Sequence, residues 1–136
     1  MLDQERLLRT AFITGAITDA VALVPLLIPE MARVLWGFDD TSGAYRFAMR
    51  YAAALMLGWT ALLLWAYRRP LERRAVAALT VLVIYGLVFA EIAAARAGAL
   101  PVWRLIPTWC LQAALLGLFT GAYHFEAVRR LVRASI

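Results

Sequence analysis

The stretch ALLLWAYRRPLERRAVAALT, residues 61–80, decides the fold of this chain. Two apolar runs meet there, separated only by RRPLERR at 68–74. Pro70 has no backbone N–H donor and disfavours helix at the residue before it, so one helix ends and a second one begins. Arginine is costly to place in the hydrocarbon layer. The stretch therefore predicts two membrane-spanning helices joined by a tight turn at the membrane surface.

Working outward from this link, the two apolar runs reach membrane length, and a further run of the same kind lies on each side. A span requires about 20 mostly apolar residues. Of the 136 residues, 64% are hydrophobic, whereas soluble domains contain roughly half. We expect one transmembrane domain over residues 1–136, with spans at about Leu7–Ile28, Ala44–Tyr67, Ala75–Ala95 and Leu105–Phe125.

The arginines predict how these spans are oriented. One side of the predicted bundle carries nine of the 14 basic residues: Arg6, Arg9, Arg68, Arg69, Arg73, Arg74, Arg129, Arg130 and Arg133. Because cytoplasmic loops are enriched in basic residues, both termini and the link are expected in the cytoplasm of a bacterium, with the protein in its inner membrane. Arginines at the ends of spans are topology signals, so a nucleic acid partner is not expected despite the net charge of +5.

The first outer loop contains PEMARVLWGF, residues 29–38. Pro29 and Glu30 suit the first turn of a helix, and an apolar stripe of Met31, Val34 and Leu35 suits the membrane surface. Ser42 then provides an N-cap for the second span. The predicted fold is all-α: an antiparallel bundle of four transmembrane helices with a short interfacial helix in the first outer loop.

Four strong polar residues lie inside the predicted spans, one in each. A charge at the centre of a span costs on the order of 3 kcal/mol, so such residues usually face the bundle interior. Counting at about 1.5 Å per residue places all four within ~6–13 Å of the outer ends of their spans. We predict one outer-leaflet cluster with two aromatic walls: Asp19, Arg50, Glu91 and Gln112, walled by Tyr85 and Trp109.

Such a cluster has three interpretations. It can line a pocket that binds a ligand or handles a proton, it can be an ion-pair network that locks the helices together, or Arg50 and Glu91 can reach the headgroups as solvated side chains. Catalytic chemistry has less support. The chain has one cysteine and one histidine, too few for a usual zinc site or for bis-histidine haem, and it contains no P-loop, GxSxG, HExxH or CxxC motif. We therefore do not expect an enzyme, a haem or a metal.

The run YRFAMRYAAALMLGWTALLLWAYRRPLERRAVAALT, residues 45–80, carries a family resemblance together with TG and PE in the first segment and LFTGAYH at 118–124. It resembles small bacterial four-helix membrane proteins that are grouped loosely with DoxX-like families. Some of these are associated with quinone-linked sulfur oxidation or oxidative-stress complexes. A fainter likeness is to the sterol-isomerase-related four-helix fold, which also places carboxylates in a membrane pocket. No motif here carries over a catalytic residue.

Three functions follow as hypotheses. The leading one is a membrane protein whose outer-leaflet pocket binds a small amphipathic ligand, a quinone or a lipid. The alternative is a structural or accessory subunit of a membrane complex or homo-oligomer, packed through the small-residue pairs Ala54/Gly58 and Gly117/Gly121. The third is a subunit of a proton-coupled transporter or channel, which requires assembly because one small bundle has little room for a pore.

Overall fold

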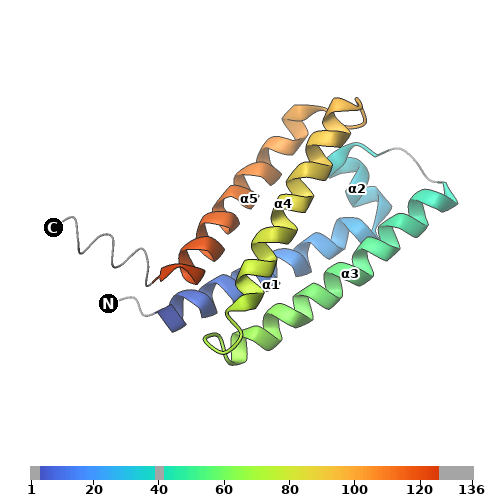
Figure 1. Ribbon diagram of the computed structural model, residues 1–136. Coiled ribbons are helices and arrows are strands. Elements are labelled where there is room, and N and C mark those ends of the chain that lie inside the picture. Colours follow the sequence, from blue (N-terminus) through green and yellow to red (C-terminus); the bar gives the residue numbers. More distant parts are fainter. Residues whose placement is uncertain (1–3, 39–41, 126–136) are drawn as a thin grey trace.

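The computed structural model describes residues 4–38 and 42–125, and every regular element in these ranges is a helix (Figure 1). In chain order they are α1 (Gln4–Leu27), α2 (Pro29–Trp36), α3 (Gly43–Arg68), α4 (Ala75–Arg96) and α5 (Val102–Tyr123). All of them except α2 are long and apolar enough to cross a membrane. The all-α class and the four membrane-length segments predicted from the sequence are confirmed, with small shifts at their ends.

The link between α3 and α4, residues 69–74, is held by its own arginines. Arg73 donates a hydrogen bond to the carbonyl of Trp65, and its guanidinium carbon lies 3.5 Å from the centroid of the Trp65 ring. Arg69 pairs with Glu72 at 3.3 Å on the surface. The last carbonyls of a helix lack intrahelical donors, and Arg73 supplies one of them at the end of α3. The break predicted around Pro70 is therefore confirmed.

Contacts between helix ends place four segments together at one end of the molecule, called the arginine end below. The side chain of Gln4 donates to the carbonyl of Ala122 at 3.3 Å, which joins the start of α1 to the end of α5. The Arg9 guanidinium lies 5.9 Å from the Tyr67 ring, and that of Arg74 lies 5.8 Å from the Tyr123 ring. The start of α1, the end of α3, the link and the end of α5 thus share this end.

The core lies where α1 packs between α3 and α5, toward the arginine end. Its largest fully buried side chains are Leu8, Phe12, Leu63 and Phe119. The rings of Phe12 and Phe119 meet at 6.1 Å between centroids. Gly15 permits this packing, because a Cβ atom there would lie 2.9 Å from Phe119 Cζ and 3.2 Å from Leu63 Cδ1. A hydrogen at this position lets α1 approach both neighbours closely.

The opposite end, called the α2 end, carries the short helix that the sequence predicted. Pro29 occupies its first turn, and it ends at Gly37, whose positive φ of 78° favours glycine. Arg104 at the start of α5 donates to the carbonyl of Arg33 at 3.3 Å and so ties α5 to α2. The predicted N-cap of the next helix is also present, since Ser42 Oγ accepts a hydrogen bond from the backbone N–H of Tyr45 at 3.2 Å.

We predict that Gly15→Ala lowers the free energy of unfolding by about 1–2 kcal/mol. The added methyl group overpacks the contact with Phe119 and Leu63, which costs about 1–3 kcal/mol, and the better helix propensity of alanine offsets up to about 1 kcal/mol of this. Thermal unfolding in detergent micelles measures the change. Gly86→Ala is the matched control, because its Cβ would meet nothing within 4 Å and the substitution should stabilise α4 slightly. Equal effects of the two substitutions would contradict the packing role of Gly15.

Candidate functional site

A cavity of about 420 Å³ lies between the four long helices. Its volume falls in the range of about 300–1,000 Å³ that is usual for small-molecule sites. Every long helix contributes to the wall, and Asp19, Trp59 and Thr80 are the lining residues whose side chains contain nitrogen or oxygen atoms. The lining residues are Gly15, Asp19, Ala52, Leu55, Met56, Trp59, Leu63, Thr80, Val83, Ile84, Leu87, Leu115 and Phe119.

Helical spacing explains which residues reach the cavity. Gly15 and Asp19 lie one turn apart on α1 and therefore share a face. On α3 the lining face contains Ala52, Met56 and Trp59, again at spacings of three and four. Gly15 on α1 lies beside Leu63 on α3. Asp19 lies one turn from Gly15 toward the α2 end, and Trp59 lies one turn from Leu63 in the same direction, so Asp19 and Trp59 are at the same level of the bundle.

The polar groups of the cavity retain hydrogen-bonding capacity. The Thr80 hydroxyl donates to the carbonyl of Val76 at 2.8 Å, so its oxygen can still accept. The indole Nε1 of Trp59 is buried and has no hydrogen-bond partner within residues 4–38 and 42–125. In the same ranges, the half-buried Asp19 makes neither a hydrogen bond nor an ion pair. The carboxyl group of Asp19 is thus the polar group left without a partner among the residues that line this apolar chamber, whereas the Trp59 N–H group is covered by neighbouring atoms.

The cavity opens sideways between α3 and α4. Figure 1 shows these helices diverging from the link that joins them. At the rim, Leu55 is 63% exposed on α3 and Leu87 is 42% exposed on α4, yet both line the cavity. Large apolar side chains at an exposed rim are compatible with lipid rather than water outside. The exposed part of the cavity lining is therefore apolar.

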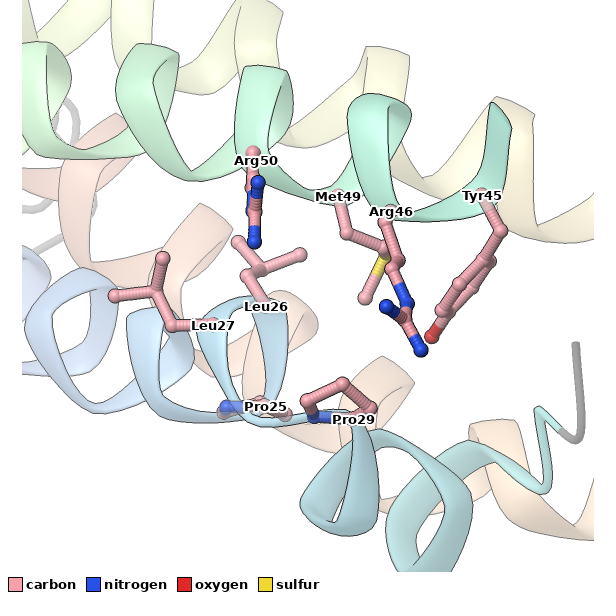
Figure 2. A pocket seen from close by; sticks show the side chains of 8 residues that line it. All are labelled: Pro25, Leu26, Leu27, Pro29, Tyr45, Arg46, Met49 and Arg50. Carbon is pink, nitrogen blue, oxygen red and sulfur yellow. The ribbon is translucent and has the colours of Figure 1, made fainter. Parts of the chain in front are cut away.

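Arg50 does not lie at this cavity, which corrects the prediction of one cluster. It lines a separate pocket of about 130 Å³ at the α2 end, where its side chain projects from α3 toward the last turn of α1 (Figure 2). On α3, Arg50 lies two residues before Ala52 and hence on a different face from the cavity lining. Within the part of the chain that the structure describes, Arg50 forms no ion pair with Asp19 or Glu91.

Glu91 and Gln112 do meet, at a third place between α4 and α5. Gln112 Nε2 donates to Glu91 Oε1 at 2.9 Å, and Gln112 is only 6% exposed. The indole of Trp109 lies beside the same carboxyl group. Glu91 Oε2, Gln112 Oε1 and Trp109 Nε1 are buried without hydrogen-bond partners among the described residues. This polar group joins two helices but lines neither of the pockets described above.

Tyr85, the other predicted aromatic wall, lies away from both pockets, and two residues that do line the cavity were not predicted. Tyr85 is 60% exposed and lines neither pocket. Trp59 and Thr80 were not singled out from the sequence, although Trp59 carried a signal. Tryptophan usually lies at the membrane interfaces, so a tryptophan in the middle of a span indicates an N–H group that needs a partner. Helical spacing places Arg46 on the same face as Arg50, one turn before it, but the predicted cluster did not include Arg46.

Comparison of the chain with protein-family models, with curated proteins and with solved structures found no match in any of the three. The likeness to DoxX-like proteins therefore stays a prediction.

We predict a measurable coupling between Glu91 and Gln112. Hydrogen bonds between helices inside membranes contribute about 0.6 kcal/mol on average and up to about 1.7 kcal/mol. A double-mutant cycle with Glu91→Leu, Gln112→Leu and the double variant should give a coupling energy in this range, measured by unfolding in mixed micelles. Tyr85→Leu combined with Gln112→Leu serves as the control, and we expect those two changes to add. A coupling of zero for the Glu91 and Gln112 pair would contradict the hydrogen bond.

Proposed function

We propose that this chain is a polytopic membrane protein that binds a small amphipathic molecule, a quinone or a lipid, in the cavity lined by Asp19 and Trp59. The observation that supports this most is the chemistry of the wall. Apart from Asp19, Trp59 and Thr80, the surface is apolar, and it opens between α3 and α4 rather than at an end of the bundle. Ligand sites commonly combine an apolar chamber with a few polar groups that orient the ligand.

The lining residues define what such a ligand would present. The Asp19 carboxyl group can accept a hydrogen bond from a hydroxyl group of the ligand, and the indole of Trp59, whose N–H group is covered by neighbouring atoms, can pack against a ring. Because the two residues are level, one polar ring or headgroup would contact both, with its hydrocarbon portion along Leu55, Val83 and Leu87 toward the opening. This arrangement replaces the pocket of four polar residues expected from the sequence.

The proposal includes the arrangement in the bilayer. The four long helices would cross the bacterial inner membrane as an antiparallel bundle, with the arginine end and both termini in the cytoplasm. Support comes from the exposed apolar side chains along the spans, among them Ile17, Val21, Phe47, Tyr51, Leu82 and Phe89. The helix α2 would lie in the outer interface, because it exposes Met31, Val34 and Leu35 and buries Ala32.

A second function, as an accessory subunit or homo-oligomer, is supported by open glycine faces. A Cβ atom at Gly58, Gly117 or Gly121 would meet nothing within 4 Å, and Ala54 is exposed one turn from Gly58. Small residues on a lipid-facing surface permit close packing with another helix. A transporter or channel subunit is a further alternative that requires the same assembly.

We expect Ala52→Phe to fill the cavity and to weaken binding of a short-chain benzoquinone by about tenfold or more, a loss of about 1.4 kcal/mol per factor of ten. Quenching of tryptophan fluorescence in detergent measures the affinity. Ala54→Phe is the matched control, because it adds the same side chain two residues away on an exposed face of α3. We expect that variant to bind as the unchanged protein does.

Native mass spectrometry of gently extracted protein supplies the second readout. Co-purified quinone or lipid that disappears in Ala52→Phe supports the cavity site. Retention of the same molecule by both phenylalanine variants rejects it, and a co-purified protein subunit or a second copy of the chain without any small molecule favours the accessory-subunit alternative.

The predicted orientation is testable with cysteine labelling, because Cys110 is the only cysteine. In a Cys110→Ala background, Glu72→Cys in the link should react with a membrane-impermeant maleimide only after the cells are permeabilised. Glu30→Cys in α2 should react in intact cells, since both positions are exposed and lie at opposite ends of the bundle. The reverse labelling pattern would invert the orientation.

A further inference from the structure

The pocket at the α2 end brings two arginines to one place. Arg46 and Arg50 lie one turn apart on α3, so their side chains emerge from neighbouring positions on one side of the helix. Figure 2 shows both guanidinium groups projecting away from α3, toward the last turn of α1 and the first turn of α2. The pocket has a volume of about 130 Å³, and its other walls are Pro25, Leu26, Leu27, Pro29, Tyr45 and Met49.

The charges of this pair are not balanced by any residue within 4–38 and 42–125. Among the described residues, neither Arg46 nor Arg50 forms an ion pair or a side-chain hydrogen bond. Like charges one turn apart on a helix repel each other. Two guanidinium groups that face one concavity present several N–H donors, which match the oxygens of a phosphate group in a bidentate manner. The site therefore suits an anion with several oxygens.

The surroundings distinguish a lipid phosphate from a phosphate in solution. Leu26, Leu27 and Met49 form an apolar wall beside the guanidinium groups. Next to the pocket, Phe47 and Tyr51 are 71% and 61% exposed and stack on each other at 6.1 Å. An anion carrying acyl chains would cover this apolar surface, whereas free phosphate would leave it uncovered.

The positions of the two arginines along α3 also favour a lipid phosphate. Arg46 lies ~5 Å and Arg50 ~10 Å along α3 from its first residue, Gly43. The headgroup layer on each side of a bilayer is roughly 5–8 Å thick. If α3 crosses the membrane, Arg46 lies at headgroup depth and Arg50 lies just below it, at the level of the upper acyl chains.

We propose that Arg46 and Arg50 form a binding site for the phosphate group of an anionic phospholipid, with the acyl chains on the adjacent apolar surface of α3. The site lies on a different face of α3 from the Asp19 cavity. It depends on the proposal that α3 spans the membrane and does not depend on any ligand of that cavity.

The test uses the full chain in detergent, titrated with phosphatidylglycerol and observed by native mass spectrometry. We expect the Arg46→Gln/Arg50→Gln variant to bind the first phosphatidylglycerol at least about tenfold more weakly, because two charge-assisted contacts are lost. Arg33→Gln/Arg96→Gln is the control, since it removes two charges at the same end and should change the affinity less than about twofold. Arg46→Lys/Arg50→Lys keeps both charges but loses the bidentate geometry, and it should bind several-fold more weakly.

Three outcomes would overturn the proposal. Equal losses in the two glutamine variants would mean diffuse attraction between charges and lipid. Unchanged phosphatidylglycerol binding in the Arg46→Lys/Arg50→Lys variant would also indicate diffuse attraction, because it would show that bidentate geometry is not needed. Arginine-dependent binding of inorganic phosphate, together with equal affinities for phosphatidylglycerol and phosphatidylcholine, would assign the site to a soluble anion. The quinone affinity of the Arg46→Gln/Arg50→Gln variant separates this site from the cavity. If only the phosphate site is lost, the variant should still bind quinone as the unchanged protein does.

Discussion

The close approach of α1 to α3 and α5 at Gly15 governs the rest of the structure. The absence of a side chain lets Phe119 and Leu63 pack against the α1 backbone, and the same three residues close the cavity toward the arginine end. The helices α3 and α4 diverge from the link that joins them, and Asp19, one turn further along α1 than Gly15, also lines the cavity. Tight helix packing and the cavity wall thus meet at one glycine.

The polar residues within the spans are distributed among three environments. Asp19 lines an apolar cavity together with Trp59, Glu91 is hydrogen-bonded to Gln112, and Arg50 lies beside Arg46 near the end of α1. Burial of polar groups in an apolar medium is costly unless partners are supplied. Among the described residues, only the second environment supplies a direct side-chain partner, which is why the other two are the places where a ligand is proposed.

Some of this arrangement could be predicted from the sequence. The lengths of the apolar runs locate the four long helices, Pro29 and Glu30 locate α2, and counting along each helix places Glu91 and Gln112 at similar depth. Counting also places Arg50 near the start of α3, but the helical pattern was interpreted as turning its side chain toward Asp19, whereas it lines the separate pocket at the α2 end. On a helix that is apolar nearly all round, periodicity does not indicate which face meets the bundle, because lipid and core accept the same side chains.

The sequence by itself therefore determined the number of long helices, the position of the arginine-rich link and the place of each polar residue along its helix, since these follow from run length, proline chemistry and helical rise. Only the tertiary structure decided that Asp19 and Trp59 line one cavity between the four long helices and that Arg46 and Arg50 line a separate pocket. The rotation of a helix about its axis and its angle to its neighbours depend on contacts between helices. At Gly15 these contacts are made by Leu63 and Phe119, which are distant in the chain.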